Sequence, residues 1–384
     1  YYVKMAKELQ NAGANIIAIK DMAGLLKPEA AYNLVSALKD AVDLPIHLHT
    51  HDGSGNAITT LNRATDAGVD IVDVAYSAFA GGTSQPSMNS FYYSMTGKDR
   101  QPDMDIEAME EMSRYWATVR PYYKGVDKAE PYPNTEVYYC EMPGGQFSNL
   151  RQQAKAVGLG DRWNEIKKMY HDVNLMFGDI VKVTPSSKVV GDMTLYMVQN
   201  DLTEKDIYEK GDTLDFPQSV VEFFEGRLGF PYQGFPEKLQ KIILKGRKPL
   251  TQRPGKLLEP VDFDAVSKKL EDAGYGHTPE DINAYCQYPK VFTDYNDRYK
   301  KYGDVSVLDT PTFFFGMKQN EEITVELEEG VDLVIKLINI SDPDDSGMRT
   351  ITFMFNGAER EIQVQDKNVD QTTVTTKKAD PDKI

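Results

Sequence analysis

Cysteine, clusters of basic residues and long apolar runs are all scarce in this chain of 384 residues. The two cysteines, Cys140 and Cys286, exclude a disulfide framework and a cysteine-ligated zinc cluster. The net charge of -16 and the lack of a basic cluster disfavour nonspecific binding to nucleic acid. No run approaches the roughly 20 apolar residues of a membrane-spanning helix, and no signal-type segment opens the chain. We therefore expect a soluble, cytoplasmic protein whose partners include neither nucleic acid nor a membrane.

Strand and helix patterns alternate in the first part of the chain. Strands are predicted near 16–20, 45–49, 70–75 and 136–141, and helices near 28–41 and 54–67. Strands that alternate with helices of this length form parallel βα units, and four such strands make half of an eight-stranded TIM barrel. Helical patterns follow, and then alternating strands with a hairpin signal at Asn356-Gly357.

The predicted fold class is therefore α/β, in three parts. Residues 1–159 form the C-terminal half of a TIM (β/α)8 barrel, 160–308 a helical domain, and 309–384 a small β-rich assembly or linker segment. The chain opens with Tyr1 inside a helical pattern and ends in TTVTTKKADPDKI, which has the composition of a linker. Both ends predict a fragment of a longer protein.

Three histidines end the second predicted strand. Successive side chains of a strand alternate between its faces, so His47, His49 and His51 share one face. Hydrogen bonds alone rarely satisfy three imidazoles so close together, and the spacing favours a metal site over core histidines. Asp73, in the third predicted strand, is given a structural role only.

Lys20 ends the first predicted strand, on the face of Ile16 and Ala18. Burial at a strand end would lower the pKa of this amine, and a neutral amine can capture carbon dioxide as a carbamate, which is an anionic oxygen ligand. The residue chemistry alone favours the alternative, a lysine paired with a carboxylate.

The motifs KDMAGLLKP, HLHTHDGSG, GGTSQPS, MPGGQFSNL, VTPSSKVVGDM and LDTPTFFFGM follow one another through the chain. This order resembles the carboxyltransferase region of the pyruvate carboxylase family over essentially the whole chain. The resemblance implies carboxyl transfer from carboxybiotin to pyruvate, giving oxaloacetate, within an ATP- and biotin-dependent ligase. It also implies a divalent metal held by His49, His51 and a carboxylated Lys20. Mn²⁺ and Zn²⁺ both suit such ligands.

The resemblance assigns three further residues to the reaction. Ser148 matches a hydroxyl residue that relays a proton between pyruvate and biotin, whereas its position also fits a helix N-cap. Ser187 and Lys188 match residues that line a biotin pocket near the carboxyltransferase site. The residue chemistry alone favours the alternative for this pair, a turn with a solvated lysine.

The partners implied by the resemblance lie partly outside this chain. They are a biotin carrier domain, whose AMKM attachment sequence is absent here, and a biotin carboxylase domain that uses ATP and bicarbonate. A homotetramer assembled through carboxyltransferase dimers is also implied, with cyclic di-AMP at the dimer interface if Tyr32 stacks on an adenine rather than packing as an interface aromatic. The alternatives are an oxaloacetate decarboxylase or transcarboxylase subunit, or an inactive assembly or regulatory fragment. We expect the chain alone to be inactive.

Overall fold

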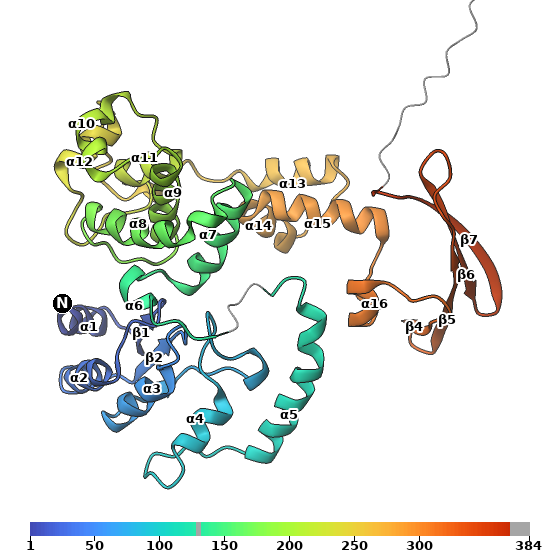
Figure 1. The fold of residues 1–384 in the computed structure, drawn as a ribbon, viewed down its shortest axis with the longest axis horizontal. Helices are drawn as coiled ribbons and strands as arrows, with labels where there is room; N and C mark the ends of the chain where they lie inside the picture. The colour runs from blue at the N-terminus through green and yellow to red at the C-terminus, as the bar shows by residue number, and fades with distance from the viewer. Residues whose placement is uncertain (128–131, 369–384) are drawn as a thin grey trace, which may run out of the picture. The chain divides into compact units, whose positions relative to one another are not determined.

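The computed structural model describes residues 1–127 and 132–368, which form two compact units. The first unit comprises Tyr1–Glu259 and holds β1 to β3 and α1 to α12, and the second begins at Pro260. The predicted α/β class is confirmed, with a strand–helix beginning, a helical part and a β-rich end (Figure 1). The predicted boundaries at 159/160 and 308/309 remain predictions.

A three-stranded parallel sheet begins the first unit. Its strands are β1 (Ile17–Asp21), β2 (Ile46–Thr50) and β3 (Ile71–Val72), in that order. The helices α2 (Pro28–Lys39) and α3 (Ala57–Asp66) connect them, as predicted. The third strand has only two residues, which is much shorter than predicted.

Side-chain alternation along the strands separates an apolar face from a polar one. Ile17, Ile46 and Leu48 are buried against α1 (Tyr2–Asn11), α2 and α3, which lie on one side of the sheet (Figure 1). The opposite face carries Lys20 and the histidines of β2. Lys20 is exposed rather than buried, as is Ala18 on the same face, so the predicted burial of this amine is wrong for this chain.

The fourth predicted strand is wrong, because residues Val137–Cys140 form the short helix α6. The stretch Val-Tyr-Tyr-Cys has residues that favour strands, but strands are stabilised by a paired neighbour. Here local bonds satisfy the backbone instead: the Asn134 side chain accepts from the Glu136 amide at 2.9 Å, and the Cys140 amide bonds to the Glu136 carbonyl at 3.0 Å. The parallel sheet of the described residues therefore has three strands rather than four.

The rest of the first unit is helical. The helices are α4 (Met88–Ser94), α5 (Ile106–Val119), α7 (Gly144–Ala156), α8 (Trp163–Met176), α9 (Ser186–Gln199), α10 (Glu204–Lys210), α11 (Gln218–Glu225) and α12 (Glu237–Leu244). The helices from α7 onward enclose an apolar core that includes the fully buried Tyr170, Phe177 and Phe224. No helix in the described part of the chain is both long and apolar enough to span a membrane.

The second unit combines four helices with an antiparallel sheet. The helices are α13 (Phe263–Asp272), α14 (Pro279–Gln287), α15 (Pro289–Tyr302) and α16 (Thr310–Phe315). The strands β4 (Glu322–Glu328), β5 (Val331–Ile340), β6 (Met348–Phe355) and β7 (Ala358–Gln365) pair in sequence order. The predicted hairpin at Asn356-Gly357 joins β6 to β7, with φ of 47° and 83° at its two residues. Asn and Gly tolerate such angles better than other residues do.

Candidate functional site

The histidines of β2 meet an aspartate that follows β3. The Asp73 carboxylate accepts hydrogen bonds from both His47 Nε2 and His49 Nδ1, each at 2.7 Å, one on each oxygen. The two imidazoles and the carboxylate are all partly buried. Burial alone would raise the pKa of Asp73, but the hydrogen bonds from His47 and His49 outweigh it and hold the pKa below its usual value. Asp73 is therefore an ionised acceptor at neutral pH.

His51 is held by the loop of the GGTSQPS motif. Its Nδ1 donates to the backbone carbonyl of Thr83 at 2.7 Å, and the Asp52 amide bonds to the Ser84 carbonyl at 2.9 Å. Burial lowers the pKa of His51, against the opposing effect of the Thr83 bond, so the neutral ring is favoured. The loop thus orients the third imidazole through its backbone.

The hydrogen bonds at Nδ1 determine where the free nitrogen of each ring points. A carboxylate and a carbonyl only accept, so His49 and His51 carry a proton on Nδ1, and the tautomer with this proton alone has its lone pair at Nε2. These two Nε2 atoms lie 3.4 Å apart. Two nitrogens about 2.0–2.1 Å from one tetrahedral Zn²⁺ would lie about 3.3–3.4 Å apart. The pair therefore fits two ligands of one metal ion.

Two imidazoles do not complete a metal site. Within residues 1–127 and 132–368, no group of three or more His, Cys, Asp or Glu side chains is arranged to hold a metal. Lys20 lies directly opposite His49 in the register of β1 with β2, so both side chains project from the same face of the sheet. A carbamate formed on Lys20 would arise beside this imidazole pair.

Ser148 lies within a helix and does not cap it. α7 begins at Gly144 after Pro143, so Ser148 belongs to the second turn, and its Oγ donates to the Gly144 carbonyl at 3.3 Å. The N-cap alternative is wrong, because a cap must precede the first helical residue. The start of α7 also abuts the histidines: a Cβ added at Gly144 would lie 2.9 Å from His51 Nδ1.

Ser187 and Lys188 lie in the first turn of α9, so the predicted turn is wrong. Ser187 is buried at 5 % exposure. The Lys188 side chain is 62 % exposed, and its Nζ lies 3.7 Å from Asp192. α9 packs against α7 where Gly191 meets Gln146, and this contact links the helix of Lys188 to the helix of Ser148.

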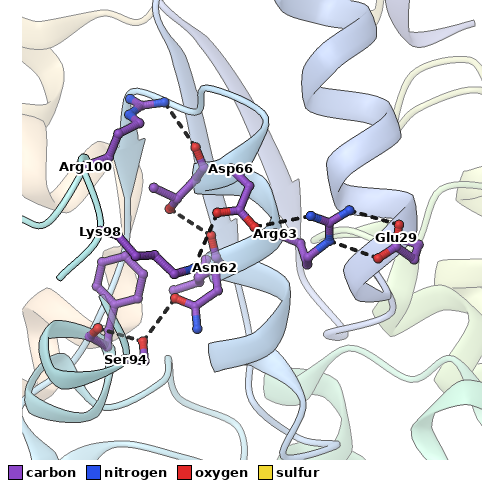
Figure 2. Close-up of polar contacts among 10 residues, drawn as sticks. Glu29, Asn62, Arg63, Asp66, Ser94, Lys98 and Arg100 are labelled. Carbon is purple, nitrogen blue, oxygen red and sulfur yellow. Dashed lines mark hydrogen bonds and ion pairs between the residues drawn. The ribbon is translucent and has the colours of Figure 1, made fainter. Parts of the chain in front are cut away.

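Tyr32 lies on α2 beneath an arginine. The Arg63 guanidinium carbon lies 4.3 Å from the centre of the Tyr32 ring. Arg63 is held there by Glu29, to which it donates at 2.9 and 3.1 Å, and by Asp66 at 3.2 Å (Figure 2). One face of the aromatic ring is thus already occupied by a cation.

Sequence reasoning missed the contribution of Asp73 and Thr83 to this site. The aspartate did carry a signal, since it interrupts an otherwise apolar stretch, IVDVAYSAF. Thr83 contributes a backbone carbonyl, which leaves no trace in the residue type. Gln85 of the same loop approaches His49 Nε2 at 3.5 Å.

Comparison with known proteins agrees with this architecture. A family model described as the conserved carboxylase domain matches residues 137–336, and one described as HMGL-like matches residues 1–115. The chain is 59% identical over 381 residues to the pyruvate carboxylase of Bacillus subtilis and 56% identical over 381 residues to that of Staphylococcus aureus. Each match covers 99% of this chain and 33% of the relative. The chain thus spans about a third of the length of these relatives.

Solved structures show the same likeness. The carboxyl transferase domain of Rhizobium etli pyruvate carboxylase has a TM-score of 0.91 with this chain and 48% identity, covering 96% of this chain and 62% of that one. The same domain has been solved with pyruvate and biocytin. The fold and site define an α/β protein of the barrel type, with its polar groups at the carboxyl ends of parallel strands. The chain belongs to the conserved carboxylase domain family and corresponds to the carboxyltransferase region of pyruvate carboxylases.

Proposed function

We propose that the protein containing this chain transfers a carboxyl group from carboxybiotin to pyruvate, giving oxaloacetate. The relatives at 59% and 56% identity are pyruvate carboxylases, which favours this reaction over that of a decarboxylase or transcarboxylase subunit. The observation that carries the proposal is the convergence of His49 and His51 Nε2 at 3.4 Å, at the carboxyl end of a parallel strand. In α/β barrels this edge of the sheet bears the chemistry.

The proposed metal ligands are His49, His51 and a carboxylated Lys20. The imidazole pair has the separation that one tetrahedral ion requires, and Lys20 is the register partner of His49. A bound Mn²⁺ or Zn²⁺ would supply Lewis-acid polarisation or a template for pyruvate. Because Lys20 is exposed in this chain, the support for the carbamate comes from register and resemblance, and not from burial.

Ser148 is proposed as the proton relay. Its Oγ donates weakly, at 3.3 Å, to a helix carbonyl one turn away, so the hydroxyl can rotate to another partner at little cost. In the proposed reaction this oxygen takes a proton from the methyl group of pyruvate and passes its own toward the ureido nitrogen of biotin. Gly144, which provides that carbonyl, lies against His51.

Ser187 and Lys188 are proposed to contribute to a biotin pocket, together with the start of α9. The exposed Lys188 amine, which is paired with Asp192 at 3.7 Å, would turn from that carboxylate to reach a ligand, whereas the buried Ser187 would act by shaping the wall. Biotin would arrive on a carrier domain, and ATP and bicarbonate would be used by a biotin carboxylase domain. The chain itself spans about a third of the relatives' length.

Assembly and regulation complete the proposal. A homotetramer through carboxyltransferase dimers and a cytoplasmic location follow from the resemblance. Cyclic di-AMP could stack on Tyr32 only at the ring face that Arg63 leaves open, or after Arg63 is displaced from Glu29.

Metal analysis and a carboxyl-transfer assay on the full-length protein test the proposal. We expect His49→Ala and His51→Ala each to lose most of the bound metal and most of the oxaloacetate formation. His277→Ala serves as a control, because this histidine is exposed in the second unit and should keep both. If both site variants keep their metal content, the ligand assignment is wrong. If the protein without substitutions forms no oxaloacetate from pyruvate and carboxybiotin, the proposed reaction is wrong.

A further inference from the structure

His47 of β2 and Asp73, the aspartate after β3, have no part in the proposed ligand set. His47 and His49 both donate to Asp73, which places a carboxylate between two imidazoles of one strand face. All three side chains are partly buried, with 26 to 36 % of their surface exposed. Both oxygens of Asp73 are thus used by imidazoles. Since His47 and Asp73 are not proposed metal ligands, this arrangement calls for another role.

We propose that Asp73, itself held by His47, is the positioning residue that aims His49 Nε2 at the metal. The inference rests on the proposed metal site and deepens it. The Nε2 of His47 is then not available as a third ligand, because it is bonded to the carboxylate.

The backbone sets Asp73 where it can act on both rings. β3 pairs with β2 through His47 and Leu48, and the Asp73 amide continues this ladder by donating to the Leu48 carbonyl at 3.1 Å. The side chain thus emerges beside residues 47 and 49, whose rings share one face. Its two oxygens take one imidazole each, at 2.7 Å.

The carboxylate controls both the tautomer and the orientation of His49. As an ionised acceptor it requires a proton on Nδ1, which leaves the lone pair on Nε2, the atom 3.4 Å from His51 Nε2. A carboxylate held at only one oxygen could still rotate about its Cβ–Cγ bond. The bond from His47 to the second oxygen restrains that rotation, so His47 acts through Asp73.

The two proposed ligands are therefore oriented by different elements. The end of β3 orients His49 through a carboxylate, and the loop that follows orients His51 through the Thr83 carbonyl. Groups that hydrogen-bond the far nitrogen of a metal-bound histidine are worth about 10- to 100-fold in metal affinity. The same order is expected for Asp73.

Substitution at Asp73 tests the inference by metal binding rather than turnover. In Asp73→Asn the amide can accept from only one of the two imidazoles, and the negative charge that raises the basicity of His49 is lost. We expect the affinity for Zn²⁺, measured by chelator competition in the protein as encoded, to fall about 10- to 100-fold. The visible bands of the Co²⁺-substituted protein should shift or weaken.

A matched aspartate of the same sheet controls for loss of charge. Asp70 accepts from the Ile46 amide at 2.7 Å and from Lys39 Nζ at 2.9 Å, so Asp70→Asn removes a carboxylate that bonds to no imidazole. We expect it to leave Zn²⁺ affinity unchanged. Thermal unfolding of each variant shows whether it is folded.

Variants at His47 keep the inference testable if Asp73→Asn does not fold. His47→Ala should lower Zn²⁺ affinity, and His47→Gln, whose amide can still donate to the carboxylate, should restore much of it. If His49→Ala loses the metal while the variants at Asp73 and His47 bind it as tightly as the unchanged protein, the positioning role is wrong and the metal site stands. If His49→Ala itself keeps the metal, the proposed site fails instead.

Discussion

Ser148 shows how a single residue changes its interpretation once its place in a helix is known. At the end of a predicted strand, a serine before a helical pattern is an ordinary N-cap. The structure places it four residues after Gly144, the first residue of α7, with its hydroxyl on the Gly144 carbonyl. This bond from a serine hydroxyl to a carbonyl one turn earlier contributes little to the stability of a helix, so Ser148 is not needed for stability.

The proton relay predicts a clear separation of activity from stability. Ser148→Ala should lower the turnover of carboxyl transfer by about 10² to 10⁴, the loss typical of a positioned acid–base group. Ser148→Thr keeps the hydroxyl and should retain much of the turnover. The free energy of unfolding should change by only about 0.5 kcal/mol in Ser148→Ala, since alanine is the better helix former. Carboxyl-transfer assays and thermal unfolding of the three proteins check this, and an active Ser148→Ala would end the relay proposal.

At the scale of elements, the start of α7 is built around its contact with His51, which follows β2, and with Thr83 of the GGTSQPS loop. Gly144 is buried, and an added Cβ would lie 2.9 Å from His51 Nδ1 and 3.1 Å from Thr83 Cβ. These two residues form the hydrogen bond that orients His51. The helix that carries Ser148 can therefore approach the imidazole pair only because its first residue has no side chain.

Neighbouring glycines provide a matched pair for testing this contact. Gly144→Ala should displace the His51 ring and lower metal affinity about 10-fold or more, as expected for disturbing a hydrogen bond behind a ligand. Gly145 is exposed and a Cβ there meets nothing within 4 Å, so Gly145→Ala should leave metal affinity unchanged. Chelator competition measures both. Equal affinities in the two variants would show that the close approach has no bearing on the site.

At the scale of the whole molecule, the parallel sheet of the described residues is open at β1. That strand pairs with β2 on one side only, and Lys20 at its end is exposed. A barrel of eight strands surrounds its site, whereas three strands form one wall of it. The three protein ligands usual in a catalytic zinc site are reached here only if Lys20, which lies on this open strand, is carboxylated.

The chain of 384 residues by itself should therefore form no oxaloacetate. We expect no product above background from pyruvate and free carboxybiotin, because three strands form only one wall of the site and leave Lys20 exposed. The protein as its gene encodes it, assayed in parallel, is the positive control. Measurable turnover by the isolated chain would mean that its three parallel strands suffice to form the site.

The sequence by itself determined the class of the fold, the helices α2 and α3, the hairpin at Asn356-Gly357 and the shared face of the three histidines. Each follows from a local rule of periodicity, turn chemistry or strand alternation. Only the tertiary structure decided that Val137–Cys140 is helical, that Lys20 is exposed, and that Asp73 and the Thr83 carbonyl aim His49 and His51. These outcomes depend on which residues distant in sequence become neighbours, and a backbone carbonyl or an unpaired strand edge is not encoded in any residue type.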